Sequence, residues 1–152
     1  MKRIPRVYLD TSVVSALFDE RNPERQKLTE EFFAASDKYE VSVSSITILE
    51  VQNTPDASLR KKMAAFIEPF QILEIDTEVE ALVNEYIRYQ AVPEDYREDA
   101  YHIAVASVNR IEYVVSWNFR HIVRKKTKDI VKIVNSMRGL AQTDIVSPGE
   151  LL

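Results

Sequence analysis

A short apolar run that ends in an acid near the N-terminus constrains the fold most strongly. Residues 7–9 are valine, tyrosine and leucine, Asp10 follows them, and Thr11 and Ser12 lead into a second apolar run. The first run predicts a buried strand, and the second predicts a helix that begins at Thr11. Asp10 is therefore expected at the carboxyl end of an early strand, the edge at which open α/β sheets bind ligands. The alternative is that Asp10 serves only as the N-cap of the helix.

Strands and helices alternate along the rest of the chain. The sequence patterns predict further strands over residues 40–44, 70–75, 113–116 and 145–146, with a terminal turn at 147–150. They predict helices over residues 11–18, 23–39, 46–51, 57–66, 77–87, 93–106 and 129–137. This alternation favours an α/β fold with a mostly parallel sheet that helices cover on both faces.

Length and composition limit the class of protein. The 152 residues predict a single domain, 1–152, and the absence of cysteine excludes disulfides, thiolate metal sites and cysteine nucleophiles. Two glycines are too few for a phosphate-binding loop of the Walker or dinucleotide kind. The apolar run near the N-terminus is short and ends at Asp10, so we expect no membrane span and a cytoplasmic protein. A formal net charge of −4 argues against a generally basic nucleic-acid binder but permits a local basic patch.

Three acids and one amide lie at positions of the predicted strands and helices from which their side chains would point into one crevice. Asp10 ends a strand, and Glu50 lies in the helix after the second strand. Asp99 lies early in a later helix, and Asn118 follows the fourth predicted strand. Each also has an ordinary alternative: Glu50 as a solvated helix position, Asp99 as a helix-dipole acid, and Asn118 as a turn residue. Apolar neighbours on both sides of Glu50 disfavour the solvated position.

Convergence of these carboxylates would require compensation of their charge. Two unit charges about 5 Å apart repel each other by about 3 kcal/mol at an effective dielectric constant of about 20. The group must then share a proton or bind a cation. Oxygen ligands with no histidine or cysteine nearby suit Mg²⁺ or Mn²⁺ rather than zinc. Such ions activate water and neutralise a phosphodiester, so hydrolysis of a nucleic-acid backbone is the expected reaction class.

Four motifs follow one another in a specific order along the chain. They are Leu9-Asp10-Thr11-Ser12, Glu50, Asp99-Ala100-Tyr101-His102-Ile103-Ala104 and Ser116-Trp117-Asn118-Phe119-Arg120-His121, with a closing Ser147-Pro148-Gly149-Glu150-Leu151. Together they resemble the PIN-domain ribonucleases, particularly toxins of the VapC type. The resemblance implies a PIN-like three-layer α/β/α sandwich and divalent-metal-dependent cleavage of RNA. It also implies a homodimer that a small antitoxin protein inhibits.

The resemblance assigns the site residues as well. Asp10, Glu50 and Asp99 match the acidic positions that bind Mg²⁺ or Mn²⁺ and carry catalysis in the family. Asn118 stands where many members have a fourth aspartate, which removes one charge from the ligand set. An Asn carbonyl can still ligate Mg²⁺ or hold a metal-bound water.

The polar residues beside these positions have two interpretations each. Thr11 and Ser12 orient a metal-bound water, or they serve as helix caps. His102 and His121 act as general bases, or they are structural. We favour the structural interpretation because metal-assisted hydrolysis needs no imidazole.

Aromatic and basic residues follow the fourth predicted strand. Trp117 and Phe119 stack on bases or, in the favoured interpretation, pack in the core. A dense basic run meets RNA phosphate or forms a solvated turn; it comprises Arg120, Arg124, Lys125, Lys126 and Lys128.

The leading hypothesis is a metal-dependent endoribonuclease toxin. The competing class is a PIN-like module that binds RNA or a protein partner and cuts weakly or not at all, which Asn118 permits. A third hypothesis, phosphotransfer with Asp10 as nucleophile, predicts an aspartate two residues later or an acid pair near the first strand. Ser12 occupies the later position, so this hypothesis ranks last.

Overall fold

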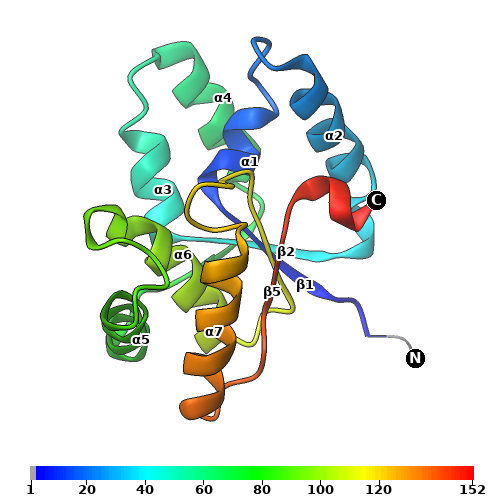
Figure 1. Cartoon of the computed structure of the whole chain (residues 1–152). Helices are drawn as coiled ribbons and strands as arrows, with labels where there is room; N and C mark the ends of the chain where they lie inside the picture. The colour runs from blue at the N-terminus through cyan, green and yellow to red at the C-terminus, as the bar shows by residue number, and fades with distance from the viewer. Residues whose placement is uncertain (1–2) are drawn as a thin grey trace.

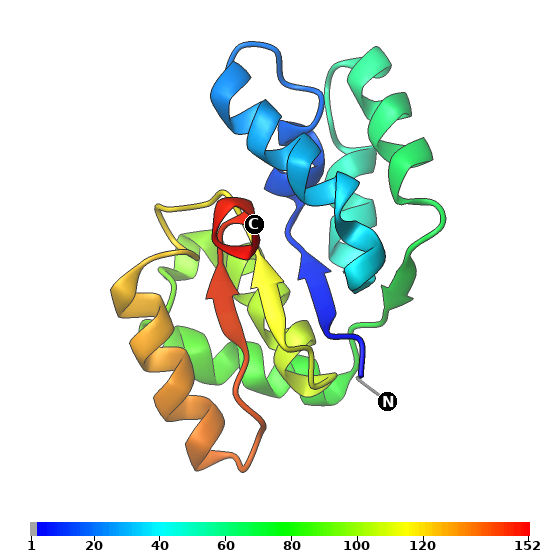
Figure 2. The same cartoon turned by 90° about the vertical axis from the view of Figure 1, so that its right-hand side faces the viewer.

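A five-stranded sheet forms the centre of the protein (Figures 1 and 2). The structure, a computed structural model, describes residues 3–152, and Met1 and Lys2 of the expected domain lie outside the described residues. The strands are β1 (Arg6–Leu9), β2 (Glu40–Ser44), β3 (Gln71–Leu73), β4 (Tyr113–Val115) and β5 (Asp144–Val146). They pair in the order β3-β2-β1-β4-β5, and every pair is parallel. The predicted mostly parallel sheet is therefore confirmed.

Strand β1 lies in the middle of the sheet. Its Val7 pairs with Val41 of β2 on one side and with Tyr113 of β4 on the other. The carboxyl ends of three neighbouring strands thus lie at one edge, directly before Asp10, the start of the third helix and Ser116.

Helices cover both faces of the sheet, which makes a three-layer α/β/α sandwich (Figure 2). One face carries α1 (Thr11–Ala16), α2 (Pro23–Ala34), α3 (Ser45–Gln52) and α4 (Ala57–Ile67), and the other carries α5 (Thr77–Arg88), α6 (Arg97–Val108) and α7 (Lys125–Met137). Short 3₁₀ turns are η1 (Ser36–Lys38), η2 (Glu94–Tyr96) and η3 (Pro148–Leu151). Successive residues of β1 serve opposite cores, since Val7 and Leu9 pack with α1 to α4 while Tyr8 packs with α5 to α7.

Four predicted helix boundaries were wrong. The helix expected over residues 11–18 ends at Ala16. The helix expected from residue 93 begins at Arg97, because residues 94–96 form the 3₁₀ turn η2. The helix expected over residues 23–39 ends at Ala34, where Ala35 leaves the helical conformation and the chain tightens into η1. The helix expected from residue 129 begins at Lys125, because the extended backbone of Arg124 places it at the N-cap. The basic run therefore supplies the first turn of α7.

Two strands are shorter than predicted. The strand expected over 70–75 spans three residues, because β2 offers register partners only from Ser42 to Ser44. The strand expected over 113–116 ends at Val115, so Ser116 lies just past the sheet edge. Among the helices of residues 3–152, none has the length and apolarity to cross a membrane.

Candidate functional site

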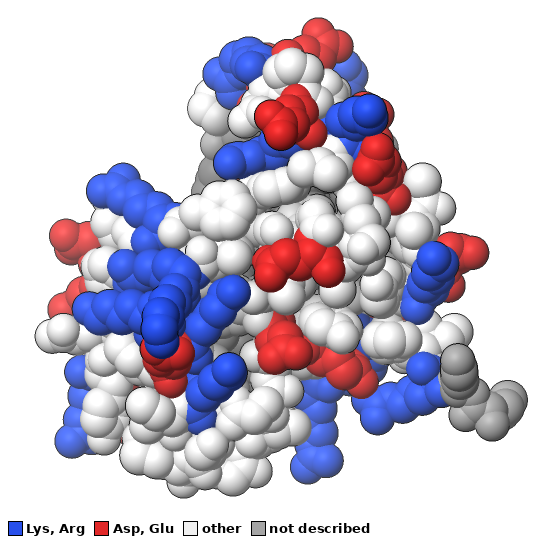
Figure 3. Space-filling model, turned by 45° about the vertical axis from the view of Figure 1, so that its right-hand side comes forward, with Lys and Arg blue, Asp and Glu red and all other residues white. Residues whose placement is uncertain are grey.

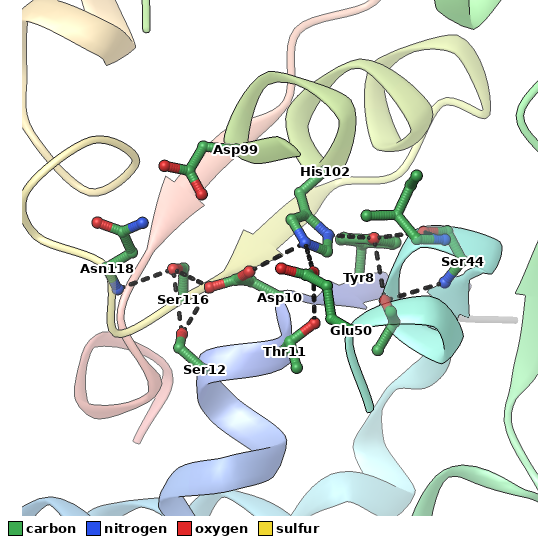
Figure 4. Close-up of polar contacts among 12 residues, drawn as sticks. Tyr8, Asp10, Thr11, Ser12, Ser44, Glu50, Asp99, His102, Ser116 and Asn118 are labelled. Carbon is green, nitrogen blue, oxygen red and sulfur yellow. Dashed lines mark hydrogen bonds and ion pairs between the residues drawn. The ribbon is translucent and has the colours of Figure 1, made fainter. Parts of the chain in front are cut away.

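Asp10 lies at the carboxyl end of β1 and is almost fully buried. Its backbone N–H donates to the carbonyl oxygen of Val115 at 3.0 Å, which ties it to β4. Asp10 occupies the N-cap position of α1, but its carboxylate makes no capping hydrogen bond. Its Oδ2 instead accepts hydrogen bonds from Ser12 Oγ at 2.6 Å and Ser116 Oγ at 2.7 Å (Figure 4). The carboxylate is thus oriented by two hydroxyls and does not serve the helix.

Glu50 reaches the same place from α3. The helix begins directly at the end of β2, where the hydroxyl of Ser44 accepts the Ile46 N–H at 3.2 Å. Glu50 lies on the second turn, and its Oε1 accepts a hydrogen bond from Thr11 Oγ1 at 2.8 Å (Figure 4). The side chain of Glu50 is 35% exposed, so this carboxylate borders the surface of the site.

His102 of α6 lies between these two carboxylates. Its Nε2 is 2.5 Å from Glu50 Oε1 and 3.3 Å from Asp10 Oδ1, and the side chain is fully buried. The expectation that no histidine lies near the acids was wrong. Residue 102 follows Asp99 by three positions, and residues three apart share one face of a helix.

The ionisable groups of the site shift one another's pKa values. Burial alone would lower the pKa of His102, but its contacts with Tyr8, Asp10 and Glu50 outweigh burial and raise that pKa well above the ordinary value. Burial likewise opposes ionisation of Glu50, yet the hydrogen bond from His102 leaves the pKa of Glu50 below its ordinary value. In the metal-free protein these directions favour an imidazolium between two carboxylates.

Asp99 lies beside this group but outside its tightest part. Within residues 3–152, one group of three acidic or histidine side chains has ligand atoms that all lie within 4.8 Å of one another. It consists of Asp10, Glu50 and His102. Asp99 Oδ2 is 3.1 Å from Nδ1 of His121. Burial and the negative charge of Asp10 raise the pKa of Asp99, and the two histidines only partly offset them. The acids therefore repel one another across the site.

Asn118 is connected to the site through Ser116. The backbone N–H of Asn118 donates to Ser116 Oγ at 2.9 Å, and that hydroxyl bonds Asp10. The Asn118 side-chain oxygen accepts the His121 N–H at 2.9 Å, so it caps the turn after β4. In the view of Figure 4, Asp99 and Asn118 lie on the opposite side of Asp10 from Tyr8. Asn118 therefore has the predicted role in a turn, and it is also connected to Asp10 through Ser116.

The structure adds two residues that sequence reasoning missed. Ser116 bonds Asp10 directly, and Tyr8 lies behind His102 with its hydroxyl 2.5 Å from Nδ1. The adjacency of Ser116 to Asp10 follows from the pairing of β1 with β4, which the sequence did not specify. Thr11 and Ser12 both donate to carboxylates of the site and so orient the acids.

The basic run lies at the start of α7 and in the turn before it. Arg120, Lys125 and Lys126 are exposed, and Lys and Arg side chains gather on the left of Figure 3. Arg124 is half-buried and bonds Thr127 Oγ1 at 2.7 Å and the Ala91 carbonyl at 3.2 Å. Arg124 therefore fixes the start of the helix. Of its exposed neighbours, Lys125 pairs with Asp129 at 2.6 Å, and the guanidinium of Arg120 lies 5.4 Å from the Tyr96 ring centroid.

The donor set of the site fits a hard divalent cation. Asp10, Glu50 and Asp99 supply carboxylate oxygens from three different elements, and Mg²⁺ and Mn²⁺ prefer such ligands. His102 belongs to the candidate ligand group, but it would have to be neutral to bind a metal, because a protonated imidazole is not a ligand. In its protonated form His102 partly neutralises the carboxylates and donates a hydrogen bond to Glu50.

Comparisons with known proteins give the family and the fold. A family model described as PIN domain matches residues 7–125. No curated protein is significantly similar in sequence. A toxin-antitoxin complex from Klebsiella pneumoniae has a chain that is 17% identical with a TM-score of 0.58, and the match covers 76% of this chain and 88% of that one.

Two further solved structures have the same fold. VapBC2 from Rickettsia felis, bound to a DNA fragment from its promoter, is 11% identical with a TM-score of 0.59 and covers 93% of this chain and 98% of that one. Mycobacterium tuberculosis VapC20, a toxin that cleaves the sarcin-ricin loop, is 16% identical with a TM-score of 0.59. The match covers 76% of this chain and 92% of that one. At these identities the similarity concerns the fold.

Proposed function

The chain belongs to the PIN-domain family, and we propose that it is a divalent-metal-dependent endoribonuclease, the toxin of a toxin-antitoxin pair. The observation that carries this proposal is the meeting of Asp10 and Glu50 around His102 at the carboxyl edge of a parallel sheet, with Asp99 near enough for the charge of Asp10 to raise its pKa. Their mutual repulsion favours a bound cation over an empty site.

The residues of the chain prepare the carboxylates for this role. Ser12 and Ser116 hold one oxygen of Asp10 and leave Oδ1 directed towards the site. Thr11 and His102 hold Oε1 of Glu50 in the same way. A set of ligands that is already oriented loses little conformational entropy when it binds an ion.

Asp10, Glu50 and Asp99 would hold Mg²⁺ or Mn²⁺, and the chemistry that such an ion supplies is charge neutralisation at the scissile phosphate and a lower pKa for the attacking water. Asn118 is connected to Asp10 through the hydroxyl of Ser116, and its side-chain oxygen accepts the His121 N–H. Before metal and RNA bind, protonated His102 would partly neutralise the negative charge of Asp10 and Glu50.

RNA binding requires positive charge outside the acidic site. The exposed side chains of Arg120, Lys125 and Lys126 are suitable phosphate contacts, and Arg124 supports them by fixing the start of α7. An RNA substrate is also consistent with the cytoplasmic location expected from the sequence.

The likeness to toxin-antitoxin complexes supports the partner assignments. The Klebsiella pneumoniae and Rickettsia felis structures contain a toxin with its antitoxin, so we propose a small antitoxin protein as partner here. A homodimer remains a prediction, which light scattering after size exclusion tests directly.

The second candidate function is a PIN-like module that binds RNA or a protein and cuts weakly. Asn118 favours it, because an amide replaces a carboxylate and its oxygen is already engaged in a turn. This module would keep RNA affinity while turnover with Mg²⁺ or Mn²⁺ stayed low.

Incubation of purified protein with structured and unstructured RNA tests the proposal. Cleavage that requires added Mg²⁺ or Mn²⁺ and stops with chelator is the expected result. Binding without cleavage at any metal concentration would favour the second candidate. Cleavage that persists undiminished in chelator would contradict the proposed metal dependence.

A further inference from the structure

An exposed aromatic ring lies in the segment after β4, next in sequence to Asn118. Phe119 is 49% exposed, and its ring meets the buried Trp117 edge to face, with centroids 6.0 Å apart and an interplanar angle of 68°. The guanidinium carbon of Arg25 lies 4.9 Å from the Trp117 ring centroid and 5.8 Å from that of Phe119. We call Arg25, Trp117 and Phe119 the aromatic platform.

The aromatic platform is held rigidly to α2. The indole N–H of Trp117 donates to Thr29 Oγ1 at 2.9 Å, and the Thr29 hydroxyl donates to the Arg25 carbonyl at 2.7 Å. Asn22 caps the helix by accepting the Arg25 backbone N–H at 3.3 Å. The backbone beneath the guanidinium and the indole ring therefore have fixed positions.

The aromatic platform is also coupled to the carboxylate at the centre of the site. The backbone N–H of Trp117 donates to Ser12 Oγ at 2.9 Å, and Ser12 donates to Asp10 at 2.6 Å. Two hydrogen bonds thus connect the backbone of the platform to Asp10. A strand of RNA with a phosphate at Asp10 would bring a neighbouring nucleotide towards Phe119.

We propose that the aromatic platform binds one unpaired nucleobase of the RNA substrate, next to the nucleotide that is cut. This inference rests on the proposed function and narrows the substrate to RNA with an unpaired segment at the cleavage point. A base must leave its helical stack before it can stack on protein rings. The bases of duplex RNA are already stacked and would not stack on the aromatic platform.

Charge favours a base over a phosphate as the main contact here. Without a bound cation the acids of the site repel the RNA backbone, whereas stacking of a base does not depend on phosphate charge. The uncharged face of a base stacks on Phe119, and the Arg25 guanidinium adds a cation–π contact. Within residues 3–152 no carboxylate forms an ion pair with Arg25.

A hollow beside the indole ring offers room for the base or its sugar. Its volume is about 290 Å³, and it is lined by Asn22, Glu24, Arg25, Leu28 and Trp117. The polar side chains of this lining can bond base edges or a ribose hydroxyl.

Trp117 is the only tryptophan of the chain, so its fluorescence reports on the platform. The experiment titrates two oligoribonucleotides of equal length into the full chain in chelator, one unstructured and one with abasic nucleotides. Anisotropy of labelled RNA gives the same affinities by a second method. Binding is measured without cleavage, which separates this test from the test of nuclease activity.

Phe119→Ala is the test variant, and Tyr89→Ala is its matched control. Tyr89 is 42% exposed and has the guanidinium of Arg88 5.4 Å from its ring centroid, but it lies at the end of α5. The wild type and the control should bind the base-bearing RNA about fivefold or more tightly than the abasic RNA and quench Trp117. Phe119→Ala should lose most of this preference and bind the abasic RNA as the wild type does.

Two results separate this inference from the proposed function. If the wild type cleaves RNA but Phe119→Ala keeps the full preference for bases, the base-binding role of the platform is overturned, and the surface would instead suit a protein partner. If the wild type shows the preference and Phe119→Ala loses it while no RNA is cut with Mg²⁺ or Mn²⁺, the platform stands and the nuclease proposal fails.

Discussion

The phenol oxygen of Tyr8 lies 2.5 Å from Nδ1 of His102, on the side of the imidazole ring opposite Glu50. The same oxygen is 2.8 Å from Ser44 Oγ and 3.2 Å from Thr47 Oγ1. In the protonated form of His102, Nδ1–H donates to Tyr8 while Nε2–H donates to Glu50. The strand that carries Asp10 therefore also fixes the cation that compensates its charge.

Tyr8→Phe should destabilise the protein by about 1–3 kcal/mol, because it leaves a buried N–H of His102 without an acceptor. Urea unfolding measures this loss. Tyr86→Phe is the matched control, since Tyr86 is equally buried and bonds Ser107 and Asn135 away from the site. Both variants should lose stability, but only Tyr8→Phe should lower RNA cleavage per folded molecule. Equal activities would show that Tyr8 has no influence on the site.

His102→Phe should cost about 3 kcal/mol at pH 6 in metal-free buffer, the lower part of the range for breaking a buried ion pair. The pKa of His102 is raised in the folded state, so its contribution is complete below the unfolded value near 6.5. It is lost as the pH rises through the folded value. The stability difference between wild type and variant should therefore shrink at alkaline pH, and a constant difference from pH 6 to 10 would contradict the imidazolium assignment.

Asp10→Asn should abolish cleavage and leave the fold intact. The amide keeps the shape and can still accept from Ser12 and Ser116, but it lacks the charge of the central ligand. Gel assays at saturating Mg²⁺ measure the activity, with circular dichroism as the check on folding. Asp37→Asn, at an exposed carboxylate of η1, should cut as the wild type does. Full activity of Asp10→Asn would remove Asp10 from the metal site.

Asp99→Ala should leave the melting temperature of the metal-free protein unchanged or raise it by a few degrees at pH 7; each kcal/mol corresponds to about 2–4 °C. Burial and Asp10 raise the pKa of Asp99, so the folded state loses stability as the pH rises through that pKa. The benefit of the substitution should disappear below the ordinary pKa of aspartate. Added Mn²⁺ should stabilise the variant less than the wild type. Strong destabilisation with the Mn²⁺ effect retained would mark Asp99 as structural.

Asn118→Asp should strengthen Mn²⁺ binding by about tenfold, or about 1.4 kcal/mol, because a charged ligand replaces an amide. A carboxylate can still accept the His121 N–H, so the turn should survive. Calorimetry measures the affinity. Metal-free stability should fall at neutral pH and recover on acidification, since added repulsion disappears when a carboxyl takes up a proton. No change in either quantity would place residue 118 outside the acidic group.

Local patterns were enough to predict the fold and the placement of the acids on it. The strand that ends at Asp10 and the helix that carries Glu50 form as predicted, because apolar periodicity and caps are encoded within a few residues. The parallel sheet followed from the alternation of elements. These features depend on neighbours in sequence.

The hydrogen bonds of the site could not be predicted in the same way. Ser116 meets Asp10 because β4 pairs with β1, a choice made by the whole fold. The spacing of Asp99 and His102 did place both on one face of α6, and it was the signal that could have included His102. The role of Asn118 as a turn cap depends on the path of the chain after β4.

The position of β1 between β2 and β4 determines when the site can exist during protein synthesis. Asp10 is made early, but the strand that holds its backbone and the hydroxyl that holds its carboxylate lie 105 and 106 residues later along the chain. Chains fold as they emerge from the ribosome, and contacts this distant in sequence form only after both partners have emerged. A nascent chain therefore lacks an assembled site until Ser116 has left the exit tunnel. A truncated chain that ends before β4 would lack Val115 and Ser116, and it should not cleave RNA by the chemistry proposed here.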